Sequence, residues 1–79
     1  MTKWSLEEKN NIYLTISKNI RYYRKMKGIT QKKLSQMTGY SLSYIKKIEA
    51  PNCQATFSIE TIYNISLALN EDIKHFFGI

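Results

Sequence analysis

The chain has 79 residues, of which 43% are hydrophobic, so it can form one small core and is too apolar to be disordered. Its single cysteine, Cys53, excludes an internal disulfide and gives no metal-ligand spacing. No apolar run approaches the roughly 18 residues of a membrane span, and the N-terminus lacks an apolar signal core, so we expect a cytoplasmic protein.

The net charge of +6 is unevenly distributed. Residues 9–48 carry ten Lys or Arg and no Asp or Glu, whereas residues 1–8 sum to −1 and residues 49–79 to −3. This basic block favours a polyanionic partner. The alternative is a solvated lysine-rich surface, but such a surface usually intersperses glutamates that form ion pairs along helices.

The first predicted helix begins at Ser5, where Ser5-x-x-Glu8 forms a capping-box pattern. One helical stripe follows at Ile12, Ile16, Ile20, Tyr23 and Met26. Gly28 stands where a left-handed residue ends a helix. We expect a single domain over residues 1–79, with residues 1–11 as an N-terminal extension and Trp4 packing as a lid on the core.

Two short helices are predicted next, joined by a corner at Gly39. Thr30 caps the first, from Gln31 to Thr38, with Leu34 and Met37 facing inward. Ser41 caps the second, which runs to Glu49. At 100° per residue, Ile45 and Ile48 share one face of this second helix, and the opposite face carries Ser43, Lys46 and Lys47.

The remaining chain predicts two further helices. Ser58 caps the fourth, whose inner side is expected to hold Ile59, Ile62, Ile65, Ser66 and Leu69. Asn70 suits a left-handed C-terminus, and Asp72 caps a last short helix within the C-terminal segment 70–79. No strand-like alternation appears, so the predicted fold class is all-α, a compact five-helix bundle.

Two helices of about eight residues around a glycine-containing turn have the spacing of a helix-turn-helix motif. The second helix can project from the surface because only its Ile45–Ile48 edge needs burial. A B-DNA major groove about 12 Å wide accepts one α-helix. The motif and the basic block together indicate a DNA-binding domain.

Several stretches resemble the phage-repressor/Cro-like helix-turn-helix family, the regulators of the xenobiotic-response-element (XRE) class. They are Thr30-Gln31-x-x-Leu34, Thr38-Gly39, Ser41-x-x-Tyr44-Ile45-x-x-Ile48-Glu49, Ser58-Ile59-Glu60-Thr61-Ile62 and Ala68-Leu69-Asn70. The resemblance implies a lambda-repressor-like domain that binds double-stranded DNA and regulates transcription, as a repressor or a self-regulating controller. It also implies a bacterial, phage or plasmid origin.

The resemblance assigns roles to residues of the motif. Base contacts are implied for Leu42, Ser43 and Lys47, and phosphate contacts for Gln31, Lys32, Ser41, Tyr44 and Lys46. Arg24 and Glu49 match a structural pair that orients the recognition helix. Simpler roles stay open: Ser41 could be only a cap, Leu42 ordinary packing and Tyr44 part of the core.

Large apolar residues are dense at the C-terminus, at Ile73, Phe76, Phe77 and Ile79. We expect them to form a homodimer interface, since two copies can read half-sites about 34 Å apart. The alternative is that some of them close the core. A different function, an antitoxin-like protein-interaction module, would use the same aromatic surface to bind a protein partner.

The sequence gives no sign of an enzyme. It has one His, one Cys, no paired carboxylates near each other and no glycine-rich phosphate loop. We therefore expect no cofactor and no small-molecule ligand.

Overall fold

The computed structural model describes the backbone of residues 6–52 and 56–78, and the side chains of residues 12–52 and 56–78. Three predictions lie outside these residues: the Ser5 cap, the Trp4 lid and the dimer contact of Ile79.

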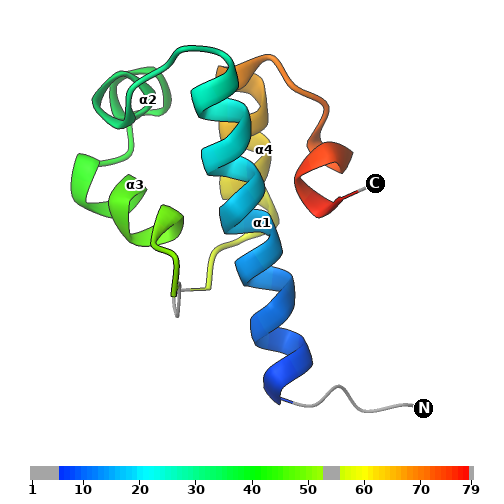
Figure 1. Cartoon of the computed structure of the whole chain (residues 1–79). Coiled ribbons are helices and arrows are strands. Elements are labelled where there is room, and N and C mark those ends of the chain that lie inside the picture. Colours follow the sequence, from blue (N-terminus) through cyan, green and yellow to red (C-terminus); the bar gives the residue numbers. More distant parts are fainter. Residues whose placement is uncertain (1–5, 53–55, 79) are drawn as a thin grey trace.

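Over the described residues the chain forms four α-helices, one short 3-10 helix and no strand (Figure 1). The elements are α1 (Leu6–Met26), α2 (Gln31–Thr38), α3 (Leu42–Glu49), α4 (Ile59–Leu69) and η1 (Ile73–Phe77). The all-α prediction is confirmed, but the prediction of five α-helices is wrong, because the last segment is the 3-10 helix. None of the helices in this part of the chain has the length and apolar content needed to cross a membrane.

The segment η1 forms one short 3-10 turn between Asp72 and Gly78. The Asp72 carboxylate accepts a hydrogen bond from the backbone amide of Lys74 at 3.1 Å, and the His75 amide donates to the Asp72 carbonyl at 3.0 Å. The second bond spans three residues, which is the 3-10 pattern. Gly78, at φ 82°, then ends the turn.

The local signals for α2, α3 and α4 are confirmed. The hydroxyls of Thr30, Ser41 and Ser58 each accept a hydrogen bond from the backbone amide three residues later, at 3.0 to 3.1 Å. Each bond satisfies an amide that the helix itself leaves unpaired. Gly39, at φ 81°, ends α2 in the left-handed conformation that an L side chain rarely adopts.

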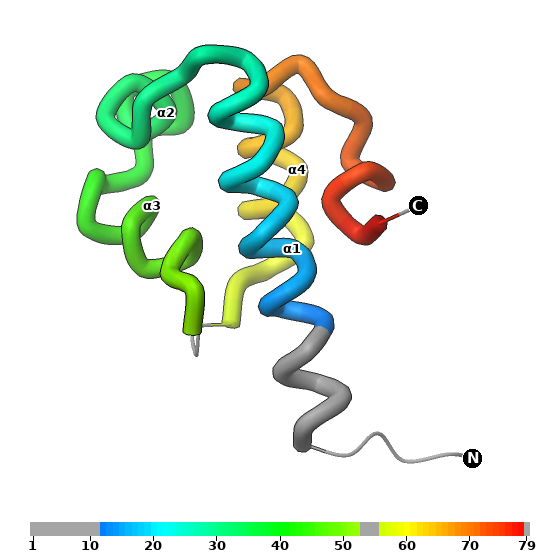
Figure 2. The backbone as a smooth tube through the Cα atoms, viewed as in Figure 1, coloured from blue at the N-terminus to red at the C-terminus, as the bar shows by residue number. Residues whose placement is uncertain are grey.

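One core joins all five elements. In Figure 2, α1 runs through the middle of the fold, with α2 and α3 on one side of it and η1 on the other. The buried hydrophobic residues are Ile16, Ile20, Leu34, Ile45, Ile48, Phe57, Ile62, Ile65, Leu69 and Phe76. Every helix therefore depends on the others for the burial of its apolar face.

Four residues predicted on inner faces are exposed instead: Ile12, Met26, Met37 and Ile59. Met37 is exposed because the inner face of α2 centres on Leu34, with Thr38 one turn further along the same side. Ile59 lies in the first turn of α4, about 60° around the helix from Ile62, and so at the edge of the buried face.

The C-terminal turn closes the core from the side of α1. Phe76 has no exposed area, and its ring packs in a T-shaped arrangement with that of Tyr23, with the ring centroids 5.5 Å apart. The side-chain amide of Asn19 donates from Nδ2 to the Phe76 carbonyl at 2.9 Å. Ile73 and Phe77 are partly buried against the same core. The structure thus places Phe76 inside the domain and not on the predicted dimer surface.

A charged cluster fastens this turn to the end of α1. Lys27 Nζ lies 3.1 Å from Glu71 Oε1 and donates to the Asn70 carbonyl at 3.1 Å. The second oxygen of Glu71 bonds to His75 Nδ1. The hydrogen bonds from His75 and then Lys27 hold the pKa of Glu71 below its usual value.

We predict that Glu71→Gln lowers the melting temperature at neutral pH. The loss should shrink as the pH falls, because a carboxylate with a lowered folded-state pKa stabilises the fold above its unfolded pKa of about 4.5 and loses that effect as it is protonated. Thermal unfolding of both proteins between pH 3 and 7 tests this. Glu60→Gln, which removes an exposed carboxylate on α4, is the control. A loss for Glu71→Gln that is independent of pH would contradict the prediction.

Candidate nucleic-acid interface

Helix α3 presents a polar face to solvent and an apolar face to the core. Ile45 and Ile48 are fully buried, while Ser43, Lys46 and Lys47 are exposed. Leu42 and Tyr44 are half-buried at the two flanks. Ile45 and Ile48 therefore anchor α3 to the core, and the outer face of the helix is accessible to a ligand.

The N-terminal end of α3 is held by an aromatic contact and by hydrogen bonds around Tyr40. Tyr44 packs edge-on against Tyr40 with ring centroids 5.3 Å apart, and the Tyr40 hydroxyl accepts a hydrogen bond from Asn64 of α4 at 2.9 Å. The Ser35 hydroxyl donates to the Tyr40 carbonyl at 2.5 Å. Tyr44 thus has a structural role, and Ser41 has the capping role described above.

The C-terminal end of α3 is held by a buried ion pair. Glu49 is 2% exposed and Arg24 of α1 is 7% exposed. Arg24 donates from Nε to Glu49 Oε2 at 2.7 Å and from Nη2 to Oε1 at 2.9 Å. This is the bidentate geometry that makes arginine–carboxylate pairs strong and directional. Arg24 Nη1 also donates to the Ile29 carbonyl at 2.7 Å, which ties the pair to the turn before α2.

Two further side chains of α1 bind the last carbonyls of α3. Ser17 donates to the Ile48 carbonyl, and Arg21 Nη1 donates to the Glu49 carbonyl at 2.7 Å. These carbonyls have no partner within the helix, and a cation at this end favours the helix dipole. Sequence reasoning missed both residues. Their signal was a polar stripe on α1, because Ser17, Arg21 and Arg24 are spaced four and three apart.

The first turn of α2 lies beside the same pair. Gln31 Nε2 donates to Glu49 Oε1 at 3.2 Å, so the predicted phosphate ligand Gln31 is also part of the buried cluster. Lys32 and Lys33 follow it and are exposed.

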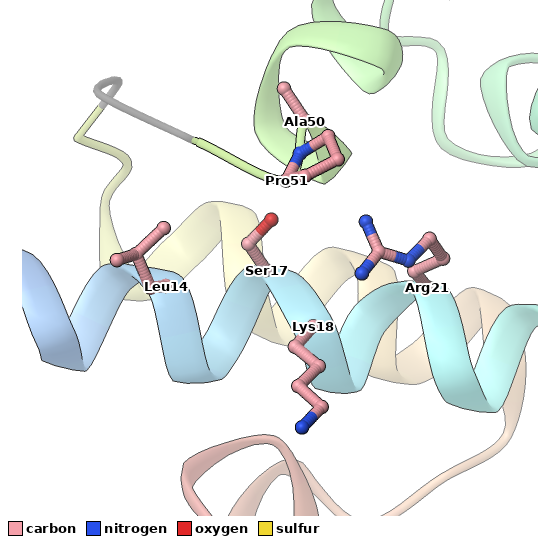
Figure 3. Close-up of a pocket in the computed structure, with 6 residues that line it drawn as sticks. All are labelled: Leu14, Ser17, Lys18, Arg21, Ala50 and Pro51. Carbon is pink, nitrogen blue, oxygen red and sulfur yellow. The ribbon is translucent and has the colours of Figure 1, made fainter.

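A small hollow borders the α1–α3 junction. It has a volume of about 170 Å³ and is lined by Leu14, Ser17, Lys18, Arg21, Ala50 and Pro51 (Figure 3). In Figure 3 the Arg21 guanidinium lies beside the Ala50–Pro51 segment, while the Lys18 side chain points away from it. The volume is well below the roughly 300 Å³ at which small-molecule sites begin.

The exposed charge of α2 and α3 is entirely positive. Their exposed cations are Lys32, Lys33, Lys46 and Lys47, and the single acid of the two helices, Glu49, is buried and paired. Across the described residues no group of three His, Cys, Asp or Glu side chains is arranged to hold a metal ion. A rigid helix with a polar outer face inside a basic surface can bind a polyanion, and α3 is narrow enough to enter a major groove.

A comparison with protein families finds a match to the model described as Helix-turn-helix, over residues 20–76. The match covers most of the chain and includes α2, α3, α4 and most of η1. No curated protein matches the chain.

We predict that Glu49→Ala destabilises the domain by about 3–5 kcal/mol, because it leaves the Arg24 guanidinium buried without its partner. Replacing both residues, as Arg24→Met with Glu49→Leu, should cost less than the single change, since no charge is then buried. Urea unfolding followed by circular dichroism measures both. A double variant less stable than Glu49→Ala would contradict this account.

Proposed function

The chain belongs to the XRE-type helix-turn-helix family of Cro/cI-like DNA-binding regulators, and we propose that it is a sequence-specific transcriptional regulator that inserts α3 into the major groove of double-stranded DNA. The observation that supports this most directly is the buried Arg24–Glu49 pair. It holds α3 at a fixed tilt while leaving the polar face of the helix in solvent. This is a family of regulators and not of enzymes.

The helical positions of the α3 side chains support the assignment of base contacts. At 100° per residue, Ser43 and Lys47 lie 40° apart and nearly opposite the buried Ile45–Ile48 edge. They would reach deepest into a groove. Leu42 and Lys46 lie together on one flank, which suits Leu42 for a thymine methyl at the rim of the site and Lys46 for a phosphate.

The assignment of phosphate contacts rests on the surfaces beside α3. Gln31 opens α2, where backbone amides favour an anion. A glutamine amide has two hydrogens, so Gln31 can donate one to Glu49 and the other to a phosphate. Lys32 and Ser41 are exposed and Tyr44 is half-buried, so we assign further phosphate contacts to the Lys32 ammonium and to the Ser41 and Tyr44 hydroxyls. These contacts would supply register and affinity but little sequence information.

We infer that the regulator acts as a homodimer, because one α3 helix reads too few base pairs to select a single site. Two copies on a palindromic operator, with half-sites about 34 Å apart, multiply their specificities. A dimer that dissociates on dilution would make binding depend on protein concentration. That property suits a repressor or self-regulating controller in the cytoplasm of a bacterium, encoded by its chromosome, a phage or a plasmid.

We predict that selection from random duplexes, followed by sequencing, enriches a palindrome with half-sites one helical turn apart. Two α3 helices related by a two-fold axis read such a sequence from opposite ends. A single unpaired half-site would contradict the dimer. No enriched sequence, together with capture of a second small protein, would favour the antitoxin-like module.

We also predict that the neighbouring variants Lys47→Ala and Lys46→Ala differ in kind. Lys47→Ala should weaken the binding free energy for the selected site by about 1–3 kcal/mol and relax the sequence preference at one base position. Lys46→Ala should weaken binding to the selected duplex and to random duplexes equally. It should also reduce the number of ions released on binding by about one, as measured from the salt dependence. Fluorescence anisotropy over a salt series measures both. If Lys47→Ala weakened binding to both duplexes equally, Lys47 would be assigned to the DNA phosphate backbone.

A further inference from the structure

Helix α4 carries an exposed apolar stripe on the side turned away from the core. Ile59 is 66% exposed, Tyr63 51% and Leu67 60%. The three residues are four apart, so they form one ridge along the helix. Three adjacent large apolar groups with more than half their area in water form a contiguous patch, which is typical of an interaction site.

A groove lies beside one end of this ridge. It has a volume of about 420 Å³ and runs between the end of α2 and the second half of α4, lined by Met37, Thr38, Asn64, Leu67 and Ala68. Ala68 is small and Met37 is flexible, so the groove can accept an apolar side chain. The ridge therefore offers a protruding group, Ile59, at one end and a receptive groove at the other.

The distribution of charge indicates that a second copy of the chain binds the α4 ridge. Nine Lys or Arg residues lie between positions 12 and 47, with no acid, whereas α4 contains no Lys or Arg and one acid, Glu60. Two copies that met through α1, α2 or α3 would bring like charges together. At the α4 surface two identical basic chains can approach each other with little repulsion. The apolar ridge of one copy can be buried by the same ridge of the other.

We propose that two copies of this chain associate through antiparallel α4 helices, with Tyr63 near the two-fold axis and Ile59 of each in the groove beside the partner's Leu67. The spacing supports this, because Ile59 and Leu67 are equidistant from Tyr63 and about 12 Å apart along the helix. The surface is thus self-complementary under a two-fold rotation, as an isologous interface requires. This inference rests on the dimer of the proposed function and names its surface.

The arrangement is compatible with DNA binding. In Figure 1, α2 and α3 lie to one side of α1, and α4 lies behind it. A two-fold axis that points toward the α2–α3 side, and passes outside the exposed ridge at right angles to α4, reverses the direction of α4 in the second copy. It leaves both α3 helices on the same side of the dimer. In this dimer the C-terminal turn makes no interface contact through Phe76, which is buried in the core of its own copy.

Sedimentation velocity of the full chain over a concentration series tests the surface. Ile59→Glu should raise the dimer dissociation constant at least 30-fold, roughly the effect of losing a hot-spot residue. Met26→Glu is the matched control, since Met26 is 56% exposed on α1 and the change in charge is the same. Circular dichroism checks that both variants fold. Equal effects of the two variants, or a wild-type chain that stays monomeric, would overturn the proposal.

Cross-linking tests the register. In a Cys53→Ser background, Tyr63→Cys should form a disulfide with its own counterpart under mild oxidation, while Tyr22→Cys, at a similarly exposed site on α1, should not. A Tyr63→Cys chain that cross-links no better than Tyr22→Cys would overturn the antiparallel pairing. The proposed function fails separately: a dimer that forms through α4 but enriches no DNA sequence would refute the DNA-binding role and leave the interface standing.

Discussion

The buried carboxylate of Glu49 is the constraint on which the recognition surface depends. A charge that is 2% exposed is tolerated only with a paired and hydrogen-bonded counterion, and Arg24 supplies it in bidentate geometry. Gln31 from α2 donates to the same carboxylate, so one acid joins three helices. Because Glu49 is the last residue of α3, this junction sets the tilt of that helix and hence where its outer side chains point.

The rest of α1 reinforces the same junction. Ser17 and Arg21 bind the final carbonyls of α3, while Ile16 and Ile20 on the adjoining face fill the core. One helix thus both buries apolar surface and caps its neighbour. At the opposite end of α3, the Tyr40–Tyr44 pair and Asn64 of α4 complete the support. A site held at both ends by regular elements is rigid, which is what recognition by a helix requires.

The surface divides into two chemically different parts. The α1 to α3 region is basic, and its interactions with a polyanion are long-ranged and weakened by salt. The α4 ridge is apolar and nearly uncharged, and its burial depends on contact and not on ionic strength. In the proposed dimer each part therefore serves a different partner. The acid-free block of residues 9–48 predicts the first part, but the ridge was hidden, because Ile59 reads as a core residue in the helical pattern.

The sequence by itself determined the features that depend on neighbours along the chain. Thr30, Ser41 and Ser58 begin their helices through bonds to amides three residues away, Gly39 ends α2, and the period of α3 separates Ser43 and Lys47 from Ile45 and Ile48. Tertiary structure alone decided the C-capping of α3 by Ser17 and Arg21, the burial of Phe76 and the exposure of Met37 and Ile59. The physical reason is that a helical pattern gives the direction of a side chain, whereas its burial depends on which distant element covers that direction.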